Sequence, residues 1–131
     1  MRGMPWAAIA ITMAGAAACG SPDAASQAPP SAEQIAAGQA AYRANGCAVC
    51  HGRDGRGDGP TAGSLRPRPP DFTDASFAAG RTVETVAAVI ASGVAAMPAF
   101  GHLDAPTRRH LAVWILSRAS SDDDVATKEQ Q

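Results

Sequence analysis

The sequence lacks the features that would commit it to several common classes of protein. Its N-terminal run of weakly apolar residues, Pro5 to Ala18, is too short to span a bilayer. The formal net charge is −1, so there is no electrostatic case for binding nucleic acid. No segment has the pattern of a β-strand, and neither an internal repeat nor a second domain is evident. We therefore expect one small all-α domain.

Residues 1–18 have the organisation of an export signal. Arg2 precedes the run from Pro5 to Ala18, which has the length of a signal-peptide core. The small residues that begin at Ala16 lead directly into Cys19, and this stretch resembles the lipobox of bacterial lipoproteins, although Ala16 stands where leucine is usual. We expect Cys19 to be lipidated, because an unpaired cysteine is a liability in an oxidising compartment. Cleavage after Ala18, leaving Cys19 free, is the alternative.

The two segments that flank the expected domain have little that could pack. Residues 19–30 are rich in alanine, serine and proline, which predicts a flexible tether behind the lipid anchor. Residues 120–131 contain three consecutive aspartates and only one sizeable apolar residue, Val125, so we expect a disordered acidic tail. The domain is thus predicted over residues 31–119. We expect it to face the periplasm in the cell envelope, anchored to a membrane by lipid.

The first predicted helix begins after Ser31. Ser31 and Gln34 fit a capping box, in which each side chain bonds the other residue's backbone N–H. The helix should run to about Arg43, since Asn45 and Gly46 mark its end. Gly38 is unfavourable inside a helix unless another backbone comes close to it.

Two more helices are predicted further along the chain. Thr82 caps the second, which ends at Gly93. The third opens at Asp104 and has an apolar face formed by Leu111, Trp114 and Ile115. The segment from Gly52 to Pro70 is dense in glycine and proline, so we expect loop throughout.

The strongest motif is the run from Cys47 to His51, which has the form Cys-x-x-Cys-His. Two cysteines at this spacing can each form a thioether to a haem vinyl group, and the next histidine can bind the iron. A redox dithiol would need a βαβ setting that this sequence lacks. A structural zinc site would need a second ligand pair, for which only His102 and His110 are available, at an unsuitable spacing. We therefore predict one covalently bound haem c, with Cys50 as the second attachment residue.

Met97 is the only methionine between Cys19 and the C-terminus. It follows the helix stop at Gly93, and Pro98 fixes a non-helical backbone beside it. A thioether sulfur in such a loop can be directed at a cofactor, so we predict Met97 as the second axial ligand opposite His51. His102, in the same loop, is the alternative ligand.

Together these residues resemble a small class I c-type cytochrome, and the resemblance covers Ser31 to about Ser117. The stretches that carry it are Cys47 to Gly52, Gly57 to Pro60, Pro69 to Phe72, Met97 to Phe100, and Leu111 to Trp114. The resemblance implies a fold in which three main helices and long Gly/Pro-rich loops surround one haem. It also implies that the first and last helices cross near Gly38, with Tyr42 against Leu111 and Trp114.

The same resemblance implies a proline carbonyl that accepts a hydrogen bond from the outer nitrogen of the histidine ligand. Pro60 is the best match, and Pro67 and Pro69 compete for this role. The residues that bind the haem propionates cannot be matched to the family. On charge alone the candidates are Arg53, Arg56 and Arg68.

The function expected from these features is one-electron transfer by a membrane-tethered monohaem cytochrome. His51 and Met97 would fill both axial positions, and the sequence has no second cofactor motif and no nucleophile paired with a base, so we expect no enzyme activity. The expected partners are membrane-bound redox proteins such as an oxidase, reductase or dehydrogenase, and the chain itself is expected to be a monomer. One alternative is a subunit of a larger respiratory or dehydrogenase complex. Another is a haem-based sensor or peroxidase from whose iron Met97 dissociates.

Overall fold

The computed structural model describes residues 28–128, and the side chains of residues 28–120. The expected signal peptide, the expected lipidation site Cys19 and most of the expected linker lie outside the described residues. The described helices are α1 (Ala32–Ala44), α2 (Ala48–His51), the 3₁₀ helix η2 (Ala62–Ser64), α3 (Ala75–Ala78), α4 (Val83–Ser92) and α5 (Ala105–Lys128). Residues 28–128 contain no β-strand, only an isolated bridge between Val94 and Met97. The all-α prediction is confirmed.

The helix starts follow the predicted caps. At α1, the Gln34 backbone N–H donates to Ser31 Oγ at 3.2 Å, and the Ser31 N–H donates to Gln34 Oε1 at 2.9 Å. At α4, Thr82 Oγ1 accepts from the backbone N–H of Thr85 at 3.2 Å. At α5, Asp104 Oδ1 accepts from the N–H of Thr107 at 2.7 Å. Each cap satisfies a backbone donor that the helix itself leaves unpaired.

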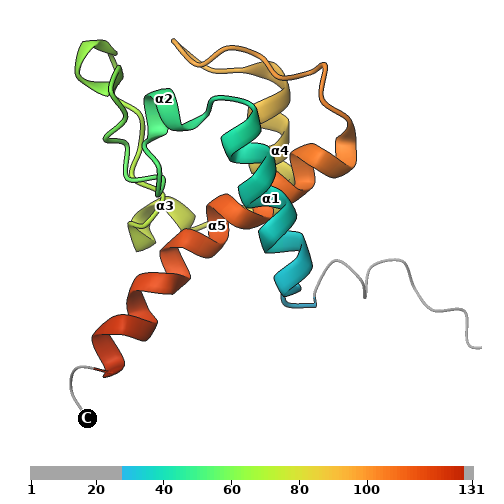
Figure 1. Cartoon of the computed structure of the whole chain (residues 1–131), viewed down its shortest axis with the longest axis vertical. Helices are drawn as coiled ribbons and strands as arrows, with labels where there is room; N and C mark the ends of the chain where they lie inside the picture. Colours follow the sequence, from blue (N-terminus) through green and yellow to red (C-terminus); the bar gives the residue numbers. More distant parts are fainter. Residues whose placement is uncertain (1–27, 129–131) are drawn as a thin grey trace, which may run out of the picture.

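The first and last helices cross at Gly38, as the family resemblance implies (Figure 1). A Cβ atom on Gly38 would lie 2.0 Å from the backbone oxygen of His110 and 2.7 Å from Trp114 Cβ. The Tyr42 and Trp114 rings pack beside this crossing with centroids 4.3 Å apart. Leu111, 1% exposed, belongs to the same core, and α4 packs against α5 behind it. The missing side chain of Gly38 thus allows the two helices to touch through their backbones.

Some local structure differs from the sequence expectation. The segment expected to be loop from Gly52 to Pro70 contains η2, and the four-residue helices α2 and α3 were not expected. Elements of this length are too short to show a helical repeat in the sequence. The largest difference is at the end of the chain, where a disordered tail was expected from Ser120 but α5 continues to Lys128. No glycine follows Gly101, and the only proline after it, Pro106, lies in the first turn of α5, so no residue stops the helix.

No helix within residues 28–128 combines the length and the apolar character needed to cross a membrane. The hydrophobic core is small and lies between α1, α4 and α5. Apolar side chains of the loops, Leu65 and Phe100 among them, line a cavity on one side of this core.

Candidate cofactor site

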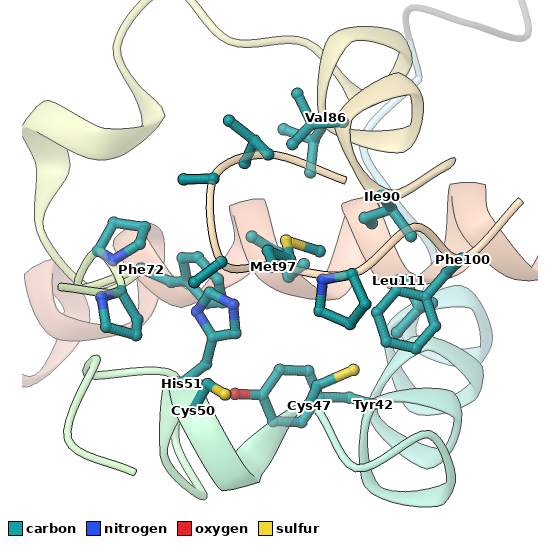
Figure 2. A pocket seen from close by; sticks show the side chains of 18 of the residues that line it. Tyr42, Cys47, Cys50, His51, Phe72, Val86, Ile90, Met97, Phe100 and Leu111 are labelled. Atoms are coloured by element: carbon teal, nitrogen blue, oxygen red, sulfur yellow. The ribbon is translucent and has the colours of Figure 1, made fainter. Parts of the chain in front are cut away.

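An apolar cavity of about 710 Å³ opens between α2, α4, α5 and two loops. The first loop runs from Gly52 to Asp74, and the second from Gly93 to Asp104. Figure 2 shows Cys47, Cys50 and His51 on one side of it, and Met97 with Val86 and Ile90 on the other. Its volume lies within the range of about 300–1,000 Å³ that is usual for small-molecule and cofactor sites. All four residues that the sequence predicts as haem attachment or iron ligands line this one cavity.

The short helix α2 brings the three residues of the attachment motif to one side of the cavity. The His51 backbone N–H donates to the Cys47 carbonyl at 2.9 Å, so the motif forms a single helical turn. Cys50 and His51 are three and four residues after Cys47, so both lie on the same face of the turn as Cys47. Neither cysteine is in a disulfide, and both are half-buried. Burial raises the pKa of the Cys47 thiol.

The loop after the motif folds back onto α2. The Thr61 N–H donates to the Val49 carbonyl at 3.1 Å, and the Thr61 hydroxyl lies 3.3 Å from Cys50 Sγ. At the other end of the motif, the Tyr42 hydroxyl donates to the Gly52 carbonyl at 2.7 Å. The motif is therefore held at both ends by the surrounding chain.

The His51 imidazole is suited to bind a metal ion. Burial lowers its pKa, so the ring is neutral near pH 7 and retains an unprotonated nitrogen that can bind a metal. Its Nδ1 atom is buried and has no hydrogen-bond partner among the residues described. A buried polar atom without a partner is costly and calls for an explanation. The neutral ring can bind haem iron through Nε2, and Nδ1 is then the outer nitrogen, to which none of the described residues, the prolines included, is hydrogen-bonded.

Met97 reaches the cavity from the turn that follows α4. The Met97 N–H donates to the Val94 carbonyl at 2.9 Å, and the Val94 N–H donates back to Met97 O at 3.2 Å. The Phe100 N–H then donates to the carbonyl of Ile90 at 2.9 Å, which ties the turn to α4. Figure 2 shows the Met97 side chain directed into the cavity. His102, the alternative ligand, is exposed and does not line the cavity.

The prolines are arranged differently from the sequence expectation. Pro60 is exposed and is not among the residues that line the cavity. Pro67, Pro69 and Pro70 do line it. The two competing prolines are thus nearer the site than the best sequence match. The order of residues along the chain could not separate them, since all three follow His51 in one irregular segment.

Two arginines line the cavity, and only one of them was a sequence candidate. Arg68 lines it, whereas Arg53 and Arg56 do not. Arg81 also lines it and gave no signal in the sequence, because it lies far from the attachment motif along the chain. Arg68 and Arg81 are therefore the cations available to negative groups of a bound cofactor.

The alternative chemistries of a Cys-x-x-Cys pair do not fit this site. In the part of the chain that the structure describes, no three His, Cys, Asp or Glu side chains form a cluster that could hold a metal ion. The same residues contain no strand and hence no βαβ unit in which a redox dithiol is usually presented. Two thiols, a neutral histidine and a thioether around an apolar cavity form a donor set that fits a covalently attached haem.

Comparisons with known proteins support a small c-type cytochrome. The model of the family described as cytochrome C oxidase, cbb3-type, subunit III matches residues 33–115. A search of curated proteins finds no significant match. Among solved structures, the chain resembles one from the Kuenenia stuttgartiensis reducing HAO-like protein complex Kustc0457/Kustc0458, with 30% sequence identity and a TM-score of 0.60. That alignment covers 70% of this chain and 47% of the other, so the chain spans less than half of its structural neighbour.

Proposed function

The chain belongs to the cytochrome c family described as subunit III of cbb3-type cytochrome c oxidase, and we propose from this premise that it is a membrane-tethered, periplasm-facing carrier of single electrons. It is a small c-type cytochrome, and electron transfer is the activity that its domain supports. The proposal adds that it holds one haem c, that His51 and Met97 are the axial ligands, and that it is not a catalyst by itself.

The observation that carries the proposal is the meeting of Cys47, Cys50, His51 and Met97 at one apolar cavity. Haem bound there would supply a couple between ferric and ferrous iron. The two cysteines would hold it covalently, while His51 and Met97 would occupy both axial positions and leave none for oxygen or peroxide. The apolar lining would limit the access of water, which is one of the means by which a protein sets a haem potential.

Replacement of Met97 tests the ligation. In the oxidised protein with haem bound, Met97→Ala should abolish the weak far-red band of an iron–thioether bond and lower the reduction potential. Axial-ligand identity accounts for much of a range of about 0.8 V among haem proteins, so the fall should be large. The ferrous variant should also bind carbon monoxide. His102→Ala is the matched control, since His102 is exposed in the same loop, and it should keep the band.

Two results would contradict this ligation. Retention of the far-red band in Met97→Ala would eliminate Met97 as the ligand. Rapid binding of carbon monoxide by the wild-type ferrous protein would instead favour a sensor or peroxidase in which the Met97 position opens.

The membrane tether rests on Cys19 and the sequence around it. A lipid chain contributes about 0.8 kcal/mol of membrane affinity per buried CH₂, and several chains together hold a protein stably. Cys19→Ser should release a spectrally normal cytochrome from the membrane fraction into the periplasm, as fractionation and immunoblotting would detect. An unmodified Cys19 in the wild-type protein, determined by mass spectrometry, would contradict the proposed anchor.

A second candidate is favoured by the structural neighbour, which is a chain of the reducing HAO-like protein complex. By this proposal the chain is a dedicated cytochrome subunit of a larger redox assembly. Purification in mild detergent distinguishes the two, because a subunit should co-purify with one partner in fixed ratio. A free carrier should elute as a monomer.

A further inference from the structure

The His51 ring begins a column of stacked side chains that runs along one wall of the cavity. The Phe72 ring stacks on it with centroids 4.7 Å apart and an angle of 23° between the planes. The Phe77 ring follows at 4.9 Å from Phe72, and the Arg81 guanidinium carbon lies 4.4 Å from the centroid of Phe77. Four side chains from α2, the loop before α3, α3 and the segment after it thus form one continuous contact.

The backbone around Phe72 is built to hold its ring in this place. The Phe72 N–H donates to the Gly55 carbonyl at 2.7 Å. Gly55 has a φ of +78°, and a Cβ atom there would lie 2.8 Å from Phe72 Cδ2. Glycine is therefore needed at this position both for the backbone conformation and for the approach of the ring. Phe72 is itself 5% exposed, so the ring has little freedom to move.

The far end of the column is fixed independently. Asp74 caps α3 by accepting from the Ser76 N–H at 2.8 Å, and α3 carries Phe77. The Arg81 guanidinium donates to the Phe77 carbonyl as well as lying over its ring. Aromatic and cation–π contacts of this kind are attractive and restrain the orientation of a ring.

His51 has no comparable restraint from hydrogen bonding, since its Nδ1 has no partner among the described residues. The stack on Phe72 is the specific contact that fixes the plane of the ring. We propose that Phe72 is the positioning residue for His51, that it sets the orientation of the imidazole toward the iron by stacking, and that Phe77 and Arg81 hold Phe72 in turn. This inference rests on the proposed ligation of haem iron by His51.

The test compares Phe72→Leu with Phe72→Tyr in the full chain with haem attached. Leucine keeps an apolar side chain but removes the planar ring, so the imidazole is free to rotate and space opens beside it. The paramagnetically shifted haem methyl resonances of the ferric protein should change their positions. The midpoint potential should fall, because water that enters the space favours the more highly charged ferric form. Tyrosine keeps a ring against His51 and should retain the wild-type methyl pattern.

Leu116→Ala serves as the control for a general loss of stability. Leu116 is a partly buried core residue that does not line the cavity, so its replacement should lower stability with no change in the methyl resonances. Wild-type resonances and potential in Phe72→Leu would overturn the proposal. If Phe72→Leu does not fold, Phe77→Leu is measured instead. This variant removes the ring that supports Phe72 and leaves the contact between Phe72 and His51 in place. A smaller shift in the same direction supports the proposal, and no shift overturns it.

If His51 does not bind the iron, the wild-type protein alone would show this. The ferric iron would then lack magnetic coupling to a histidine nitrogen. In Phe72→Leu, by contrast, the covalent haem and the far-red band should both persist. The positioning role and the ligand role of His51 are therefore measured separately.

Discussion

Tyr42 links the helix crossing to the cofactor site through a single buried side chain. Its ring packs on Trp114 and its hydroxyl donates to the Gly52 carbonyl directly after the attachment motif. Burial raises the pKa of this hydroxyl well above its usual value, so it remains a protonated donor at every working pH. Tyr42 therefore contacts both α5 and the residue that follows α2.

Removing that hydroxyl should cost stability without removing the haem. Tyr42→Phe removes the shorter of the two hydrogen bonds to the Gly52 carbonyl and leaves the Gly55 N–H at 3.3 Å as its donor. Loss of one such hydrogen bond costs about 0.5–1.5 kcal/mol. We expect a loss of this size in the free energy of unfolding of the haem-loaded protein, measured with denaturant. Ser64→Ala, which removes an exposed hydroxyl donating to the Thr61 carbonyl at 2.8 Å, should cost less. Equal losses in the two variants would contradict the role given to Tyr42.

At the scale of single residues, the sequence predicts which side chains line the cavity where those residues form one contiguous motif. Cys47, Cys50 and His51 follow from spacing alone, and Met97 follows from the absence of any other downstream methionine. The sequence does not predict Phe72 or Arg81 at the site, because their positions depend on the path of an irregular loop. Nor could it choose among prolines in that loop, of which Pro60 proves to be exposed.

The pairing of α1 with α5 depends on one missing side chain. Gly38→Ala would place a methyl group against the His110 backbone oxygen, which cannot rotate away as a side chain could. The better helix propensity of alanine contributes at most about 1 kcal/mol. Overpacking a tight contact costs ~1–3 kcal/mol and more when the backbone must move. The clash should therefore outweigh the propensity.

We expect Gly38→Ala to lower the thermal midpoint of the haem-loaded protein in a calorimetric scan. Gly63→Ala is the matched control, since no atom lies within 4 Å of a Cβ placed there. That variant should leave the midpoint almost unchanged. A Gly38→Ala protein as stable as the wild type would show that the helices can separate at little cost.

Among the elements, those with strong caps were predictable and those held by tertiary contacts were not. Ser31, Thr82 and Asp104 mark helix starts that local chemistry alone specifies. The helices α2 and α3 are single turns stabilised by the loops around them, so the sequence has no periodic pattern that predicts them. The polar composition after Ala119 predicts disorder, whereas α5 continues to Lys128 because no breaking residue interrupts it.

On the scale of the whole molecule, the haem would complete the core. The buried cluster between α1, α4 and α5 is small, and one flank of it is the wall of the cavity. Small domains of this kind depend on a metal, a staple or a cofactor for stability. The folded state should therefore require covalent haem.

Cys47→Ala combined with Cys50→Ala should abolish attachment and most of the helical circular dichroism. In the wild type, by contrast, the haem should stay with the polypeptide through acid–acetone extraction and denaturing electrophoresis. Cys19→Ser, which removes a cysteine outside the motif, is the control and should keep covalent haem. Wild-type haem that can be extracted, or a double variant with native helicity, would contradict this dependence.

The contact between α1 and α5 also sets an order of events during biosynthesis. Gly38 and His110 touch although nearly the whole domain lies between them in sequence, and closing so long a loop is slow compared with forming a local turn. A chain that emerges N-terminus first presents its attachment cysteines before the last helix exists to cover Tyr42. The attachment motif would thus be accessible in an open polypeptide, and the packing of α5 against α1 would be the step that closes the domain around the bound haem.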